Sequence, residues 1–406
     1  MYIKRKIETR LVENLERDEI IVLVGARQTG KTTLLKKLKQ TADEKKETTF
    51  FINLENKRYL NLLNQEPENL FQLTGKLPDR KIVVFIDEIQ YLKDPSNFLK
   101  YMYDEYAGKV KLVVSGSSAF YIDQQFKDSL AGRKRLFTLK VLDFKEFLEF
   151  EGCGEMVEYF PGVPLLKKRE IPGLVEDKLK QLFLEFIKFG AFPGVVLEKK
   201  NKEKIYLLEE LLNSYLARDV ETMGIKKKDK FFTLIRLLAV QVGGLVNLSE
   251  LANTLKISVT AVENYLHILE KSFQVKKITP FSANLRKELS KMPKLYFLDL
   301  GMRNIALDNF DLLEFRMDKG MVWENLVFKL LDDRDDTGNI NFWRTQDKKE
   351  VDFIIDRKYA LEVKFNGDKY NQKKYGLFLE TYPDIPLRVV CHVNPHPGHL
   401  TFLDLV

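Results

Sequence analysis

The stretch GARQTGKTTLLKKL, residues 25–38, follows the apolar run EIIVLVG at 19–25 and decides the fold of the N-terminal part. Its spacing Gly-x4-Gly-Lys-Thr is that of a phosphate-binding loop (P-loop), placed between a predicted buried strand and a predicted helix. The glycines let backbone N–H groups approach phosphate oxygens closely, and the helix that begins at Lys31 points its positive end at the same phosphates. We therefore predict a nucleotide site here.

ATP is the expected nucleotide and Mg²⁺ its expected metal ion. Lys31 would bridge the β- and γ-phosphates, and Thr32 would hold Mg²⁺ through its hydroxyl. The residues that we expect to bind the nucleotide are Gly25, Ala26, Arg27, Gln28, Thr29, Gly30, Lys31, Thr32 and Thr33.

A P-loop of this kind needs a carboxylate for the metal, and KIVVFIDEIQ at 81–90 supplies one. Asp87 ends an apolar run, where a contact to Mg²⁺ is expected. Glu88 follows it directly and would polarise the attacking water as the general base. The pair predicts hydrolysis of the nucleotide.

The next apolar run ends in VVSGSSAF at 113–120. In sheets of this kind a polar side chain there lies between the two carboxylates and the γ-phosphate. We choose Ser117 for this role, with Ser115 as the alternative, and an ordinary serine-rich turn is also open.

Apolar runs alternate with helical segments over the first 145 or so residues. Each run is short, β-branched or aromatic, and almost continuously apolar, as expected for parallel strands with helices on both faces. This alternation predicts an α/β fold built on an open sheet. The predicted strands are 19–25, 48–55, 81–88, 111–118 and 135–142.

The middle of the chain has helical periodicity, with amphipathic segments at 177–189 and 205–220. Residues 248–281 then predict helix, turn, helix and a strand pair, which is the order of a winged helix-turn-helix. The outward residues of the second helix include Glu263 and contain no Arg or Lys before Lys271, although base readout and phosphate contact use cations and amides. A bracing or protein-contact role is therefore favoured over sequence-specific DNA reading.

The final part of the chain predicts helix, three strands, helix and strand, an order that resembles the core of the restriction-endonuclease-like, or PD-(D/E)xK, fold. Asp352 lies in the second strand, and Glu362 and Lys364 lie two apart in the third, so that they share a face. Glu324, on the preceding helix, would complete three oxygen ligands for a metal ion. Metal-activated water could then cleave a phosphodiester, with Lys364 orienting the nucleophile. A solvated strand face with paired charges is the alternative, and Val351 replaces the usual proline.

Several of these motifs together resemble the AAA-type core of a widespread bacterial and archaeal family of predicted ATPases. They are GARQTGKTT, FIDEIQ, SGSS and SLAGRKRLF, with YLARDV, PKLYFLDLG and EVDFII…LEVK further along the chain. The resemblance implies that Arg133 is a candidate arginine finger that acts on a neighbouring subunit or across a domain interface, in a possible homo-oligomer. A solvated basic turn is the other interpretation of Arg133. Arg218 would contact the nucleotide or form a structural pair with Asp219.

The expected organisation has four parts. They are an AAA-type P-loop ATPase domain (1–155), a helical linker or lid (156–229), a winged helix-turn-helix (230–284) and a nuclease-like α/β domain (285–406).

The whole sequence sets the class of protein and its partners. With 45% hydrophobic and 31% charged residues in 406, it is typical of a globular protein of several domains. No apolar run is long enough to span a bilayer, no secretory signal is recognisable, and the two cysteines predict no disulfide, so a cytoplasmic location is expected. The net charge of +7 permits contact with nucleic acid. We therefore predict an ATPase coupled to a nuclease-like domain and acting on nucleic acid, or else an ATP-controlled switch or scaffold with an idle nuclease-like domain.

Overall fold

The computed structural model describes residues 2–75, 80–116, 130–160, 166–222, 225, 227–281, 292–334 and 337–406, with 215–222 through their backbone alone. The chain divides into two units, residues 1–141 with 271–273 and residues 142–270 with 274–406. This division falls inside the stretch 1–155 that was expected to form the ATPase domain. The four-part division stays a prediction.

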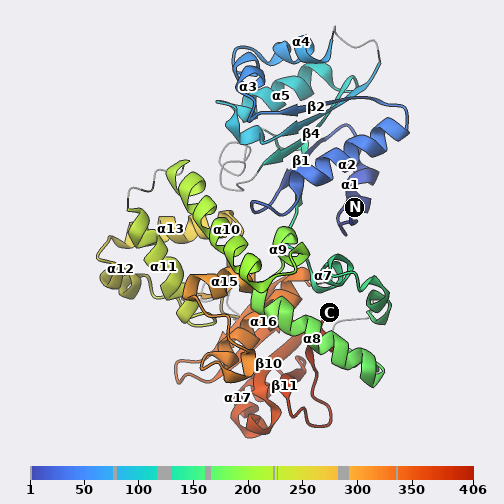
Figure 1. The fold of residues 1–406 in the computed structure, drawn as a ribbon. Helices are drawn as coiled ribbons and strands as arrows, with labels where there is room; N and C mark the ends of the chain where they lie inside the picture. The colour runs from blue at the N-terminus through green and yellow to red at the C-terminus, as the bar shows by residue number, and fades with distance from the viewer. Residues whose placement is uncertain are drawn as a thin grey trace. The chain divides into compact units, whose positions relative to one another are not determined.

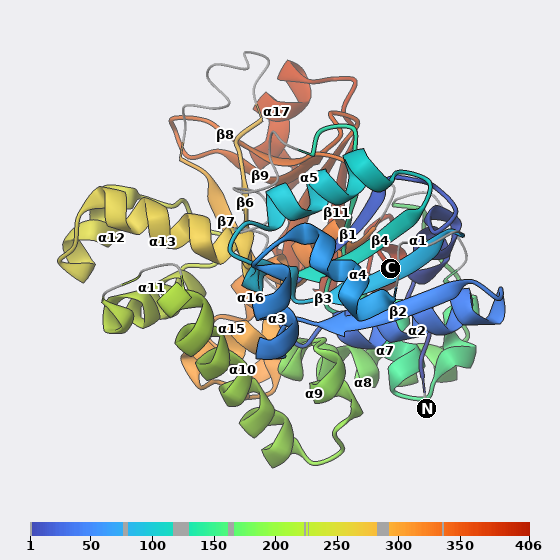
Figure 2. The same cartoon turned by 90° about the horizontal axis from the view of Figure 1, so that it is seen from above.

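A five-stranded sheet organises the first unit (Figures 1 and 2). All its neighbouring strands are parallel, and their order is β2-β3-β4-β1-β5. Each of the five predicted strands is present, so the predicted α/β fold class is confirmed. The strands are β1 (Ile20–Val24), β2 (Thr48–Asn53), β3 (Ile82–Asp87), β4 (Val110–Gly116) and β5 (Lys134–Thr138).

The continuous apolarity of β1 follows from helices on both faces of the sheet. Ile20 and Val22 belong to one hydrophobic cluster, whereas Ile21 and Leu23 belong to the other. The first cluster includes α3 (Lys57–Leu63), α4 (Leu70–Thr74) and α5 (Pro95–Tyr106), and the second includes α1 (Glu8–Asn14) and α2 (Lys31–Glu44). Alternate side chains of a strand point to opposite faces, so neither face of β1 can be polar.

Helices form most of the second unit before its sheet. They are α7 (Phe144–Phe150), α8 (Gly173–Phe189), α9 (Pro193–Leu197), α10 (Asn201–Thr222), α11 (Lys228–Val240), α12 (Leu248–Leu255), α13 (Val259–Lys271), α15 (Leu300–Leu307) and α16 (Lys319–Asp333). None of the helices in the described residues combines the length and the apolarity that a bilayer crossing requires.

The segment 248–281, predicted to be a winged helix-turn-helix, contains α12, α13 and one strand of a pair. Ser258 accepts a hydrogen bond from the backbone N–H of Ala261 at 3.2 Å and so caps the start of α13. β6 (Val275–Ile278) pairs in antiparallel fashion with β7 (Lys294–Phe297). The partner of β6 thus lies outside the segment 248–281 from which the strand pair was predicted. This pairing brings Lys294 into the second unit's interior.

A four-stranded sheet of order β11-β10-β9-β8 lies in the last part of the chain, with β10 and β11 labelled in Figure 1 and β8, β9 and β11 in Figure 2. Its strands are β8 (Ile340–Arg344), β9 (Glu350–Ile355), β10 (Tyr359–Asn366) and β11 (Leu387–Val393), of which β10 and β11 are parallel. Helix α16 packs on β10. In place of the predicted helix before the last strand, the structure has a 3₁₀ turn (Gln372–Tyr375) followed by the short α17 (Gly376–Thr381), with Tyr375 between them at φ −103° and ψ 5°.

Candidate functional site

The P-loop lies between the carboxyl end of β1 and the start of α2. Gly30 has φ +96°, and Gln28 also has a left-handed backbone, with φ 57°. A Cβ at Gly25 would lie 2.2 Å from the carbonyl oxygen of Leu139, so only glycine fits there. The first glycine of the motif is therefore required by packing against the segment after β5, and the second by its backbone conformation.

Lys31 is buried under the loop that it follows. Its Nζ donates to the carbonyl oxygens of Gly25 at 3.1 Å and Ala26 at 2.7 Å. The Thr29 hydroxyl also donates to Ala26 O, at 2.9 Å, and so closes the loop. Arg27 is partly exposed, and Gln28 and Thr33 are exposed. The predicted nucleotide-binding residues of 25–33 thus lie along the loop and the first turn of α2.

Thr32 and Asp87 meet directly, although 55 residues separate them in the sequence. The Thr32 hydroxyl donates to Asp87 Oδ2 at 2.6 Å. Asp87 ends β3 and is 1% exposed. Both side chains are hard oxygen donors, which is the ligand chemistry that Mg²⁺ prefers. These two residues therefore fit the predicted magnesium site.

Ser115, the alternative to Ser117, lies beside the two carboxylates. β4 pairs with both β1 and β3, so the end of β4 is between the P-loop and Asp87. The Ser115 hydroxyl donates to Asp87 Oδ1 and accepts a hydrogen bond from the Glu88 N–H at 3.2 Å. Ser117 lies outside the described residues. Ser115 therefore contacts Asp87 and the backbone of Glu88, and its predicted place beside the γ-phosphate stays a prediction.

Glu88 has a strained backbone, with φ 61° and ψ 48°. A residue with a Cβ rarely adopts this left-handed conformation, and such strain is concentrated at functional sites. The Glu88 carboxylate accepts a hydrogen bond from the Gln90 side chain. The backbone and this contact together restrain the Glu88 side chain directly after the end of β3.

Arg5 is a residue of this site that sequence reasoning missed. Its guanidinium donates to the carbonyl oxygen of Thr29 in the P-loop at 2.8 Å and to that of Lys140 at 2.8 Å. Arg5 is 6% exposed. It therefore ties the base of the loop to the segment after β5, and the sequence marks it only by the basic run KRK at 4–6.

Arg133 lies at the amino ends of the parallel strands, whereas the P-loop lies at their carboxyl ends. It precedes Lys134, which is in register with Ile20 at the start of β1, whereas the P-loop follows the end of β1. Its Nε donates to Asp104 Oδ1 at 2.6 Å and its Nη2 to Asp104 Oδ2 at 3.1 Å. Arg133 is thus paired within the first unit and is remote from the P-loop of its own chain. The side chain of Arg218 lies outside the described part of the structure.

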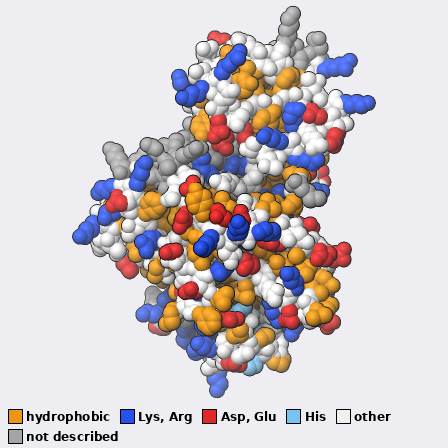
Figure 3. Space-filling view, viewed as in Figure 1, with side chains coloured by type: hydrophobic (Ala, Val, Ile, Leu, Met, Phe, Trp, Pro, Cys, Tyr) orange, Lys and Arg blue, Asp and Glu red, His pale blue; other side chains and the backbone are white. Residues whose placement is uncertain are grey.

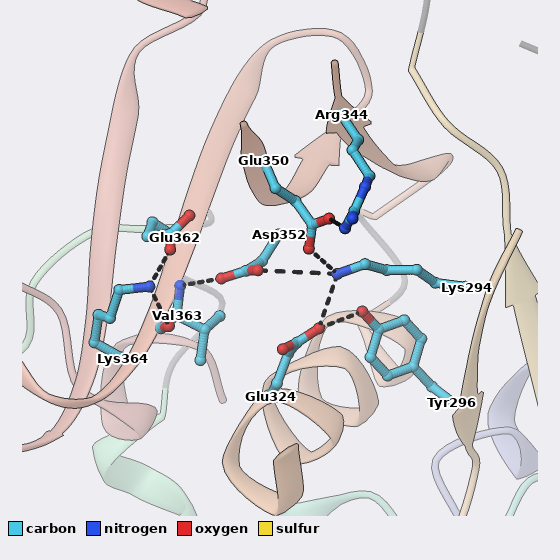
Figure 4. Close-up of polar contacts among 9 residues, drawn as sticks. All are labelled: Lys294, Tyr296, Glu324, Arg344, Glu350, Asp352, Glu362, Val363 and Lys364. Atoms are coloured by element: carbon cyan, nitrogen blue, oxygen red, sulfur yellow. Dashed lines mark hydrogen bonds and ion pairs between the residues drawn. The ribbon is translucent and has the colours of Figure 1, made fainter. Parts of the chain in front are cut away.

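In the C-terminal sheet, Glu362 and Lys364 share a face of β10, as their spacing predicts, and form an ion pair (Figure 4). Asp352 is adjacent on β9, where its Oδ2 accepts a hydrogen bond from the Val363 N–H at 2.8 Å. Asp352 and Glu362 are 8% and 4% exposed. The predicted carboxylates and lysine are therefore brought together by neighbouring strands.

A second lysine, Lys294 of β7, enters the same cluster (Figure 4). Its Nζ lies 2.6 Å from Glu350 Oε1, 3.2 Å from Glu324 Oε1 and 4.0 Å from Asp352 Oδ1. The Tyr296 hydroxyl also donates to Glu324 Oε1, at 2.6 Å. Glu324 and Asp352 thus share Lys294 with Glu350.

Burial and charge set the protonation of this cluster. Burial raises the pKa values of Glu324 and Asp352, against the opposing effect of the Lys294 ammonium. Burial and the charge of Asp352 raise the pKa of Glu362, and Lys364 opposes them. Burial alone would lower the pKa of Lys294, but the surrounding carboxylates outweigh it and raise that pKa above its usual value. Lys294 therefore stays protonated at neutral pH.

The predicted metal ligands of this sheet are divided between two lysines. Lys364 pairs with Glu362, whereas Lys294 pairs with Glu324 and Asp352. In the part of the chain that the structure describes, no three His, Cys, Asp or Glu side chains are arranged to hold a metal ion. The trio of Glu324, Asp352 and Glu362 therefore does not fit a divalent ion in this arrangement.

Sequence reasoning missed Lys294 and Glu350. Glu350 is two residues before Asp352 in β9, so the strand period places both on one face. Lys294 is the one charged residue in the apolar stretch KLYF, whose four residues are all buried. A lysine in such a strand indicates a buried acidic partner, because an unpaired charge there is costly.

Comparison with protein families gives three matches along the chain. Residues 17–148 match an AAA domain, 180–313 match a domain of unknown function (DUF8612), and 319–399 match another (DUF4143). These matches support an AAA-type ATPase with a C-terminal domain of unknown function.

The chain also resembles full-length proteins from archaea and bacteria. It is 29% identical to the uncharacterized protein MJ1544 of Methanocaldococcus jannaschii, over 92% of this chain and 79% of that protein. It is 26% identical to the uncharacterized protein Rv2008c of Mycobacterium tuberculosis, over 89% of this chain and 74% of that protein. The similarity therefore covers both units.

Among solved structures, the Aeropyrum pernix ORC2 protein in its ADP form has a TM-score of 0.37 at 13% identity, over 68% of this chain and 87% of that one. AMPPCP-bound DnaA from Aquifex aeolicus has a TM-score of 0.28 at 18% identity, over 65% and 86%. Likenesses this distant support no inference about function.

Proposed function

We propose that this protein is a Mg²⁺-dependent ATPase. The observation that carries the proposal is the 2.6 Å hydrogen bond between Thr32 and Asp87, directly beside the P-loop. It joins the two oxygen donors that a P-loop ATPase uses for its metal, and Glu88 follows Asp87 at the same edge of the sheet. The match of residues 17–148 to an AAA domain supports the same activity.

Each residue has a separate task in this proposal. Lys31 and the loop N–H groups bind the phosphates, and Thr32 and Asp87 hold Mg²⁺, which neutralises phosphate charge when it is bound. Glu88 accepts the proton of the attacking water. Ser115 orients Asp87 through its hydroxyl and holds the Glu88 N–H, so it positions both carboxylates.

Phosphate release from ATP tests this proposal. Lys31→Ala should abolish nucleotide binding and hydrolysis, because the cation for the β- and γ-phosphates is lost. Lys36→Ala, an exposed lysine on the same helix, is the matched control and should keep both. The proposal would be refuted if the wild-type protein with Mg²⁺ hydrolysed no ATP over a series of ATP and salt concentrations.

We further propose that ATP controls a switch or scaffold rather than a constitutive nuclease. The carboxylates of the C-terminal domain are paired with lysines of the same chain, Glu362 with Lys364 and Glu324 with Lys294. Fold and chemistry separate readily in evolution, so a nuclease-like order of elements does not require cleavage.

Metal-dependent cleavage of nucleic acid is the second candidate function. It is favoured by one observation, the contact of Asp352 with the Val363 N–H at 2.8 Å, which places Asp352 beside Glu362 and Lys364. Single-stranded, duplex, branched and RNA substrates, with Mg²⁺ or Mn²⁺ and with or without ATP, test it. Cleavage that is lost in Asp352→Ala, Glu362→Ala and Lys364→Ala would establish it.

A nucleic-acid partner stays a prediction from the net charge of +7. The geometry supports protein contact rather than base readout by α13, whose exposed face includes Glu263. The strand lysines nearby are paired, Lys276 with Asp332 and Lys277 with Glu270 at 2.7 Å. Acidic and basic side chains are interspersed on the face in Figure 3. Binding that weakens steeply with salt would show phosphate contacts.

A further inference from the structure

Lys294 lies among three carboxylates from two elements (Figure 4). Glu324 belongs to α16, and Glu350 and Asp352 belong to β9. One oxygen of each lies between 2.6 and 4.0 Å from the Lys294 ammonium. Lys294 is 2% exposed, so solvent contributes little to its neutralisation.

Backbone elements surround this lysine and its partner Glu324. Ile278 of β6 is in register with Lys294, and Leu245 forms a bridge to it from the other side. The Glu324 carboxylate is confined as well, because a Cβ at Gly243 would lie 2.8 Å from its Oε1. The backbone of Lys294 is therefore fixed on both sides, and the Glu324 carboxylate packs closely against the backbone at Gly243.

The charges of the cluster do not balance. The three carboxylates are opposed by two cations. One is Lys294, and the other is Arg344, which pairs with Glu350 alone among the three. The sum of these five groups is −1 when all are ionised, and it becomes −2 without the lysine. Buried carboxylates with such an excess bind either protons or a cation, because an uncompensated buried charge is costly.

We propose that Lys294 is a built-in cation of the C-terminal domain, which occupies the position that a divalent metal ion would take between Glu324, Glu350 and Asp352 and so keeps metal out. This inference goes beyond ATP hydrolysis and does not depend on it. Metal-dependent chemistry at this cluster would require Lys294 to leave.

Replacement of the lysine by an apolar residue of similar length tests the proposal. Lys294→Met in the full-length protein, without nucleotide, should bind one Mn²⁺ per chain in calorimetry, at least tenfold more tightly than wild type. Mn²⁺ should also raise the melting temperature of the variant and leave that of wild type unchanged, because only the variant has ligands to offer. Adding Glu324→Gln or Asp352→Asn to the variant should remove both effects.

Lys364→Met is the matched control, since it removes the neighbouring lysine and leaves Lys294 in place. It should gain no Mn²⁺ binding, and a gain equal to that of Lys294→Met would contradict the proposal. If Lys294→Met does not fold even with Mn²⁺, Lys294→Gln provides an uncharged side chain that can still donate hydrogen bonds, and the same gain is required of it. Wild-type protein that binds one Mn²⁺ per chain, with loss of binding in Glu324→Gln, would overturn the proposal whatever the variants do.

Discussion

The Thr32 hydroxyl donates a hydrogen bond to Asp87 Oδ2 at 2.6 Å, which joins the first turn of α2 to the end of β3. Thr32→Val keeps the side-chain shape and removes the hydroxyl. We expect hydrolysis to fall about a hundredfold or more with Mg²⁺, because one of the two metal-holding oxygens is lost. Nucleotide affinity measured in EDTA should change little.

The control for this prediction is Thr41→Val on the same helix. The Thr41 hydroxyl donates only to the helix carbonyl of Lys37, at 3.1 Å. Its loss should leave hydrolysis unchanged. Equal activity of Thr32→Val and Thr41→Val would exclude Thr32 from metal binding.

Glu88→Gln should bind ATP with normal affinity and turn it over slowly. The amide keeps the shape of the side chain but cannot accept the proton of the attacking water, a role worth roughly 10²–10⁴-fold in rate. Nucleotide trapping and steady-state phosphate release measure the two properties separately. Glu105→Gln, on an exposed turn of α5, is the control, and normal turnover by Glu88→Gln would remove Glu88 from the mechanism.

Asp318 neutralises two buried arginines in the second unit. Arg303 Nη2 donates to its Oδ2 at 2.7 Å, and Arg316 Nε donates to its Oδ1 at 2.8 Å. Asp318→Asn leaves both cations without a counter-charge, so we expect a loss of roughly 3–5 kcal/mol in the free energy of unfolding. Urea denaturation measures it, with exposed Asp311→Asn as the control.

The same carboxylate makes stability depend on acid. Burial alone would raise the pKa of Asp318, but the hydrogen bonds and charges of Arg316 and Arg303 outweigh it and lower that pKa to about 2. A lowered pKa in the folded state means that the stabilisation is complete above the unfolded value near 4 and is lost as the pH falls toward 2. The decline between these values should be shallower in Asp318→Asn, and an unchanged slope would refute this prediction.

The nucleotide site could be predicted from sequence because its signals are local. Gly25 and Gly30 are required by backbone geometry, and Asp87 follows five consecutive apolar residues of one strand. Once the strands are arranged in a parallel sheet, the ends of β1 and β3 lie at the same end of the sheet, so Thr32 and Asp87 are expected to be close. The α/β fold class followed from the same apolar runs.

The carboxylate cluster could be predicted only in part, because its key cation comes from a distant strand. Spacing placed Glu362 beside Lys364 on one strand face. Lys294 and Glu350 are 56 positions apart in the sequence, and Lys294 lies on β7, which pairs with β6. Local periodicity within either strand therefore cannot predict their contact. The buried lysine was visible in the sequence, but its partners were not.

Arg133 cannot reach the P-loop of its own chain along the sheet. It precedes β5, whose 5 residues separate the two edges by about 16 Å at ~3.3 Å per residue. An arginine finger at this position must therefore act on a second chain. Its bidentate pairing with Asp104 would have to break for that contact, and the hydrogen bond from Arg133 lowers the pKa of Asp104, as expected for a stable carboxylate partner.

Two inactive variants test this action between chains. Arg133→Ala should keep ATP affinity and lower turnover about a thousandfold or more, the effect expected when an arginine finger is lost. Mixed with Lys31→Ala, it should regain part of the activity, because an interface can then combine an intact P-loop from one chain with an intact Arg133 from the other. Asp104→Ala is the matched variant: it removes the intrachain partner and leaves Arg133 present, so turnover should be kept or raised.

Phosphate release measured over a series of mixing ratios distinguishes the two roles of Arg133. If no ratio restores activity and Asp104→Ala is as inactive as Arg133→Ala, the pair is a structural ion pair of the first unit.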